Sequence, residues 1–76
     1  RETIRAAGSQ YASMMRQIEV AETNLEGAEK DIQRVKTRYR RGEISKGAYR
    51  KLVEEYNGRI EEAEATIDGV LLRLRE

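Results

Sequence analysis

The stretch TRYRRGEISKGAYRK, residues 37–51, decides the fold of this chain because it holds the clearest signals for ending one helix and starting another. Gly42 follows an Arg-rich segment, where a glycine typically ends a helix in the left-handed conformation. Ser45 is a favourable N-cap residue for a helix that follows. The stretch therefore predicts a single turn between two helices.

Upstream of this turn, apolar residues recur every seven positions in two interleaved series. The a positions of this heptad pattern are Ile4, Tyr11, Ile18, Leu25, Ile32 and Tyr39. The d positions are Ala7, Met14, Ala21, Ala28 and Val35. A pattern sustained over five heptads is typical of a coiled-coil helix. It predicts a helix over residues 3–40.

Downstream of the turn, the same two series continue. The a positions are Val53, Ile60, Ile67 and Leu74, and the d positions are Tyr49, Tyr56, Ala63 and Val70. They predict a second helix over residues 45–75, after a turn at 41–44. The predicted fold class is all-α: two long helices forming one antiparallel coiled-coil hairpin over residues 1–76. Because the chain begins with Arg1 and not Met, we expect it to be a fragment of a longer protein.

The register of the hairpin follows from the numbering, because facing residues of an antiparallel pair have position numbers with a constant sum. Eight a–d pairs, from Tyr39–Tyr49 to Met14–Leu74, all sum to 88. Several pairs set an alanine against a larger side chain, which favours close interdigitation. Beside this seam, Asp31 and Arg59 are expected to form a weak salt bridge.

Charge is segregated along the chain, although the net charge is only +1. Residues 30–51 contain nine basic and two acidic residues, a net charge of +7, and the remainder carries −6. The hairpin places the end of the first helix beside the start of the second, so these cations gather at one end. The candidate site for phosphates or an acidic partner comprises Arg34, Arg38, Arg40, Arg41, Lys46, Arg50 and Lys51.

Two interpretations of this basic end stay open. Cations suit the C-terminus of the first helix, which accounts for part of the charge, but those that start the second helix oppose its dipole and indicate binding. Arginine can contact phosphates in two places at once, so nucleic acid or an anionic membrane surface are possible partners. Tyr39 and Tyr49 either stack on bases or belong to the core, as their heptad positions favour.

The open end of the hairpin exposes apolar surface in this pattern. Ile4, Ala7 and Tyr11 have no facing residue, and Met15 and Leu71 widen the stripe. The candidate association face comprises Tyr11, Met14, Met15, Ile18, Val70, Leu71 and Leu74. We expect a second copy to cover it, forming a four-helix bundle; the rest of a longer protein and a different partner are the alternatives.

The composition argues against catalysis. The chain contains no Cys and no His, so it lacks a thiolate nucleophile, an imidazole base and the ordinary ligands of zinc. Acidic residues on the second helix suggest a solvated face, and a two-helix hairpin offers no enclosed substrate pocket. We predict no enzyme activity, no metal and no cofactor. No apolar run reaches the roughly 20 residues of a membrane span, and we expect a cytoplasmic location.

The turn and the start of the second helix resemble the short helical modules called SHOCT domains. The resemblance covers residues 37–56 and rests on Gly42, Ile44, Ser45, Tyr49 and Leu52. It implies an oligomerisation or interaction element. The predicted function is therefore a non-catalytic protein–protein interaction module, and the alternative is a nucleic-acid-binding arm whose basic end contacts phosphates.

Overall fold

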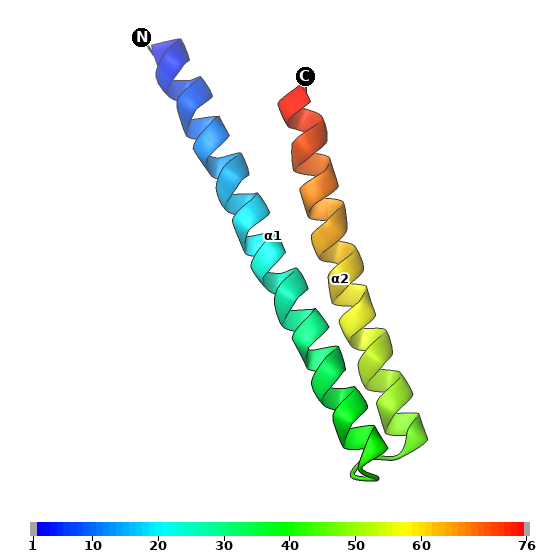
Figure 1. Cartoon of the computed structure of the whole chain (residues 1–76). Helices are drawn as coiled ribbons and strands as arrows, with labels where there is room; N and C mark the ends of the chain where they lie inside the picture. Colours follow the sequence, from blue (N-terminus) through cyan, green and yellow to red (C-terminus); the bar gives the residue numbers. More distant parts are fainter. Residues whose placement is uncertain (1, 76) are drawn as a thin grey trace.

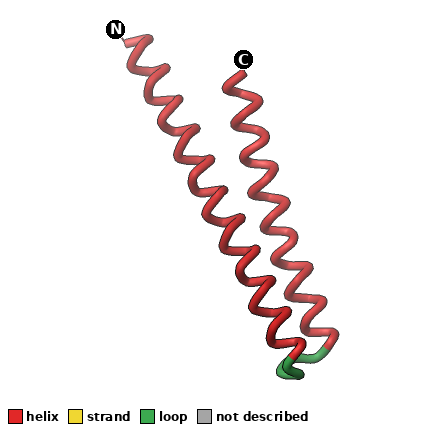
Figure 2. Tube along the Cα trace, in the orientation of Figure 1, coloured by secondary structure: helices red, strands yellow, loops and turns green. Residues whose placement is uncertain are grey.

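The protein is a hairpin of two helices. The computed structural model describes the backbone of residues 2–75 and the side chains of residues 8–75. Helix α1 spans Glu2–Arg40 and helix α2 spans Lys46–Arg75, and they pack side by side along their length (Figure 1). A short loop joins them at one end, while both termini lie at the other (Figure 2). The predicted all-α helical hairpin is confirmed.

Helix α1 ends in a Schellman motif. The amide of Glu43 donates to the carbonyl of Arg38 at 2.9 Å, and the amide of Gly42 donates to the carbonyl of Tyr39 at 3.0 Å. These are the two hydrogen bonds that define the motif, and they satisfy carbonyls left without partners at the helix end. Gly42 has the left-handed φ of 75° that the motif requires. The chain reverses here because glycine adopts this conformation without a steric penalty.

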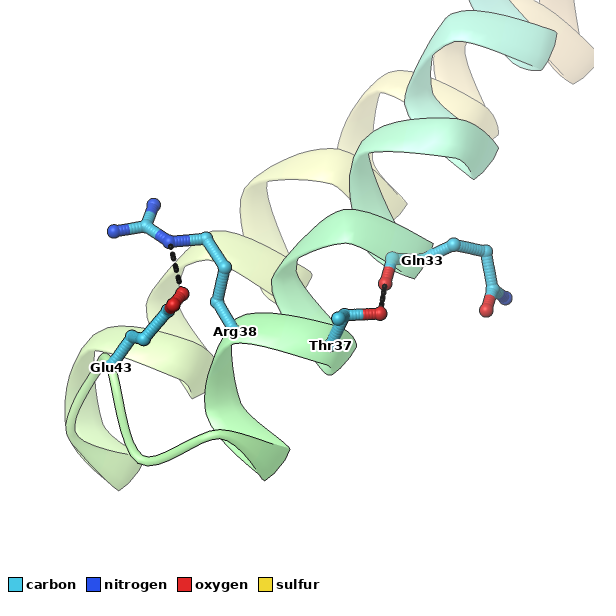
Figure 3. A network of polar contacts seen from close by, with 4 residues as sticks. All are labelled: Gln33, Thr37, Arg38 and Glu43. Carbon is cyan, nitrogen blue, oxygen red and sulfur yellow. Dashed lines mark hydrogen bonds and ion pairs between the residues drawn. The ribbon is translucent and has the colours of Figure 1, made fainter.

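An ion pair accompanies this motif, in the place where an apolar contact is common. Nε of Arg38 lies 3.6 Å from a carboxylate oxygen of Glu43 (Figure 3). These are the C3 and C″ positions of the motif, which usually carry apolar side chains that touch. At the residue before Arg38, the hydroxyl of Thr37 donates to the carbonyl of Gln33, one turn earlier along the helix, at 3.1 Å. The end of α1 is therefore held by polar contacts.

Helix α2 starts on an N-cap. The hydroxyl of Ser45 accepts a hydrogen bond from the amide of Ala48 at 3.1 Å, so Ser45 lies just before the helix and caps it. Ile44 and Tyr49 occupy the two positions of a hydrophobic staple, and both are half-buried. The N-cap and the staple therefore fix the start and the direction of α2 only three residues after Gly42.

The core lies along the predicted seam. Among residues 8–75, every buried side chain occupies an a or d position of the heptad pattern: Ile18, Ala21, Ala28, Val35, Ala63 and Val70. Most of the other seam residues are half-buried, because two helices can cover each stripe from one side only. The stripe is therefore both the core of the hairpin and the surface from which further packing can start.

Two contacts between the helices agree with the predicted register. The rings of Tyr39 and Tyr49 stack with centroids 4.5 Å apart and an angle of 10° between their planes. Near the open end, a guanidinium nitrogen of Arg73 donates to the side-chain oxygen of Gln17 at 3.4 Å. One flanking contact differs from the prediction: Arg59 does not pair with Asp31 across the seam. Arg59 binds Glu55 of its own helix at 2.8 Å.

Substitution of Gly42 tests whether its left-handed conformation requires glycine, and substitution of Gly47 in the same stretch is the control. Gly42→Ala should destabilise the hairpin by about 1–2 kcal/mol, because a Cβ is strained at a left-handed φ. Gly47→Ala should stabilise it by up to about 1 kcal/mol, because Gly47 lies in the first turn of α2 and a Cβ there meets no atom. Urea unfolding followed by circular dichroism gives both values. Equal effects of the two substitutions would contradict the assignment of the cap to Gly42.

Candidate functional site

The turn brings the seven predicted cations to one end of the hairpin. We call this cluster the basic tip, and all of its members are exposed: Arg34, Arg38, Arg40, Arg41, Lys46, Arg50 and Lys51. The Schellman motif ends α1 directly after its last arginines, and the N-cap starts α2 at Lys46. Both arms therefore contribute charge to the same end of a rod whose Cα trace measures 61 × 15 × 13 Å.

Two members of the basic tip have acidic partners nearby. Arg34 lies 3.7 Å from Asp31 one turn earlier, and Arg38 pairs with Glu43. Arg34 and Arg38 also line a shallow groove on α1 together with Gln33, Thr37 and Arg41. The two acidic residues within the basic segment are thus both engaged by arginines of that segment.

The other five members make no ion pair with any residue that the structure describes: Arg40, Arg41, Lys46, Arg50 and Lys51. Arg40 stands in the last turn of α1, where the helix dipole favours a cation. Helix α2 has no acidic residue in its first turn, so Lys46 stands at a helix end that disfavours positive charge. The tip therefore carries more positive charge than its helix ends stabilise.

The two tyrosines of the tip face each other. Because Tyr39 and Tyr49 stack on one another, each ring uses one face for the other. Tyr49 is half-buried, and Tyr39 is 37% exposed. The structure thus supports the core interpretation of these residues and leaves the tip without an open pair of aromatic rings.

The predicted association face divides into a buried and an exposed part. Ile18 and Val70 are buried inside the hairpin, at 8% and 0% exposure, so they do not form the surface that a partner would meet. Their a and d positions point into the seam, where the facing helix covers them. The side chains of Ile4 and Ala7 lie outside the described residues.

The remaining members of this face are accessible to a partner. Tyr11 is 57% exposed, Leu71 46% and Leu74 37%. Met14 and Met15 are half-buried. We call these five residues the end face. It lies at the end of the rod opposite the basic tip, so the molecule has an apolar end and a charged end.

A shallow groove between the helices was not predicted. Val20 is 60% exposed and lines it beside Ala21 of α1 and Ala63 of α2. Ala21 and Ala63 are buried in the seam at 4% and 6% exposure, and the groove lies beside the seam with the exposed Val20 in its lining. The sequence offered one clue to this groove: the outward-facing Val20 stands beside a small seam residue. The heptad pattern alone does not predict the groove.

Other kinds of site find no support in the described part of the chain. Within residues 8–75 no three acidic side chains come together in a way that could hold a metal ion, and this includes the acidic residues of α2. Neither α1 nor α2 contains, within residues 2–75, an apolar stretch long enough to span a bilayer.

Comparison with protein-family models, with curated proteins and with solved structures finds no match to this chain. The resemblance of residues 37–56 to SHOCT modules therefore stays a prediction. The site must be interpreted from its own geometry, which offers an apolar end face and a basic tip.

Proposed function

We propose that this chain is a non-catalytic protein–protein interaction module, an antiparallel coiled-coil hairpin that associates with a second copy of itself through the end face. The observation that carries the proposal is the exposure of Tyr11, Leu71 and Leu74 at one end of the rod. Exposed apolar side chains clustered in this way are more typical of interfaces than of isolated monomers. Packing two hairpins through such a face produces a four-helix bundle at the junction.

The charge pattern supports one orientation of the two copies. Residues 17–29 and 59–71, the middle of the rod, carry eight acidic residues and one basic residue, a net charge of −7. The open end, residues 8–16 and 72–75, carries three arginines and no acidic residue. A parallel pair in register would place one acidic middle on the other. An antiparallel overlap places each basic open end beside the partner's acidic middle, and like-charge contact is avoided.

This arrangement has a measurable length. The Cα trace of one hairpin is 61 Å long. An antiparallel arrangement that lays residues 8–29 of the two copies side by side places residue 8 beside residue 29 of the partner and residue 2 beside residue 35. The overlap is then about 51 Å at about 1.5 Å per residue, so the dimer should measure about 70 Å with both basic tips outward. A parallel dimer would stay near the length of one hairpin. The two tips lie together in the parallel dimer and about one dimer length apart in the antiparallel one, so energy transfer between dyes attached to the tips separates the two arrangements. Light scattering should give a mass of twice 8.8 kDa at low and high salt.

Substitution of one end-face residue tests the interface itself. Leu71→Asp should weaken the dimer at least tenfold, because it places a charge in an apolar contact that a partner must desolvate. Val20→Asp is the matched control. Val20 is also an exposed apolar residue within the overlap, but it lines a groove to which none of the five end-face residues contributes. Light scattering over a concentration series measures both. A monomeric parent chain, or equal weakening by the two substitutions, would refute the proposal.

A further inference from the structure

The basic tip carries charge that the fold does not need. Five of its cations make no ion pair with any described residue, although the segment contains two carboxylates, both of which pair with arginines. Lys46, Arg50 and Lys51 crowd the beginning of α2, where the helix dipole makes positive charge unfavourable. Mutual repulsion among these cations adds to the cost. A residue set that weakens the fold in this way points to an anionic ligand.

We propose that the basic tip binds duplex nucleic acid through its backbone phosphates, without reading the sequence. A duplex carries one negative charge per about 1.7 Å of its axis, which supplies several phosphates to a cluster of five cations at one end of a narrow rod. Arginine matches phosphate geometry because its guanidinium can donate two parallel hydrogen bonds. Within the basic tip, Arg40, Arg41 and Arg50 are the arginines that make no ion pair with any described residue.

The tip is better suited to the outside of a duplex than to bases. Proteins that bind single strands stack exposed aromatic rings on successive bases, and here Tyr39 and Tyr49 stack on each other. The rod is 15 × 13 Å across its Cα trace, whereas the major groove is about 12 Å wide and admits one helix. Two helices side by side therefore remain at the level of the phosphates.

An anionic membrane fits the tip less well. Surface-bound helices combine basic residues with apolar side chains that enter the lipid interface. Among the described residues of the tip region, Tyr39 is the one large hydrophobic side chain that is exposed, while Ile44 and Leu52 are half-buried. The basic tip has the charge for a membrane surface but lacks an apolar anchor.

This inference does not depend on self-association. The basic tip and the end face lie at opposite ends of the rod, so a monomer and a dimer both present the tip. An antiparallel dimer would present two tips about one dimer length apart, and could hold two duplexes. Failure of the dimer would therefore leave the binding of one duplex to one tip intact.

The test measures binding of a mixed-sequence DNA duplex by fluorescence anisotropy over a salt series. If each of the five cations displaces about one counterion, the slope of log K against log salt should be about −4.5, and affinity should fall about 500-fold from about 50 to about 200 mM salt. Duplexes of different sequence should bind equally. A single strand of the same length, anionic vesicles and a Glu-rich peptide of matched charge should bind more weakly than the duplex.

Two triple variants locate the site. Arg41→Gln, Lys46→Gln and Arg50→Gln together should bring the slope to about −2, because three phosphate contacts are lost. Arg16→Gln, Arg73→Gln and Arg75→Gln together remove the same charge from the open end and should leave the slope unchanged. Circular dichroism verifies that both variants keep the helical content of the parent chain.

Four results would overturn the proposal. They are the absence of duplex binding at low salt, an affinity that does not change with salt, equal losses in the two triple variants, and tighter binding of the vesicles, the peptide or the single strand than of the duplex. The dimer mass, measured on the same samples, separates a failure at the tip from a failure of self-association.

Discussion

Val35→Asp should abolish the cooperative unfolding transition of the hairpin and most of its helical signal. Val35 is 5% exposed and occupies a d position of the seam. A carboxylate there would be buried without a partner, which costs several kcal/mol. Folded chains have a stability of roughly 0.05–0.15 kcal/mol per residue, so a chain of 76 residues has about 4–11 kcal/mol in total. One substitution can therefore remove most of the stability.

Val20→Asp provides the matched comparison for this experiment. It makes the same chemical change in the same helix, at a valine that is 60% exposed. We expect a loss below about 1 kcal/mol, from helix propensity alone. Thermal and urea unfolding followed by circular dichroism measure both variants at one protein concentration. If Val35→Asp kept the transition of the parent chain, the seam would not be the core of this fold.

The heptad pattern is strong enough to predict which positions are buried, because both helices repeat it in step across one short turn. It does not predict how deeply each residue is buried. Val70 and Leu74 belong to the same stripe of α2, but Val70 is fully buried and Leu74 is 37% exposed. The burial of a side chain depends on neighbouring residues on both sides of it along the rod. A residue near the open end of the rod has fewer such neighbours. Periodicity carries no information on this point.

The polar contacts were less predictable than the core. Arg59 can reach Asp31 across the seam or Glu55 one turn away, and in the structure it binds Glu55. A partner four residues away in the same helix is already positioned, whereas a partner across the seam depends on the spacing of the helices. In the sequence, Glu43 is one of only two acidic residues in the basic segment 30–51, and its partner is not evident. Its pairing with Arg38 follows from the Schellman motif, which brings these two positions together.

The functional surfaces were predicted as sets of residues and not as shapes. Charge counting located the basic tip, because the turn brings both arms to one end of the rod. The predicted association face included Ile18 and Val70, which are buried between the two helices and are not accessible to a partner. The groove beside Val20 was missed because most of its lining residues stand outside the a and d positions that the heptad pattern describes. Heptad patterns record where apolar residues stand, and they do not record the space left between them.

Exchange of two facing core residues should restore stability that each single substitution removes. The register pairs Ala28, which is 3% exposed, with Ile60, which is half-buried. Ala28→Ile alone should cost about 1–3 kcal/mol, because it forces extra volume into a closed seam. Ile60→Ala alone should cost about 2 kcal/mol through lost apolar burial and the space left behind. The double variant keeps the total volume of the pair.

A double-mutant cycle measures this complementarity. We expect the loss in the Ala28→Ile/Ile60→Ala variant to fall short of the sum of the single losses by at least about 1 kcal/mol. The control combines Ala28→Ile with Ile67→Ala, since Ile67 is also a half-buried a-position isoleucine of α2 but faces Ala21. Distant, independent sites add within about 0.5 kcal/mol, so this pair should show no coupling. Coupling of equal size in both pairs, or in neither, would mean that the alanines do not set the register.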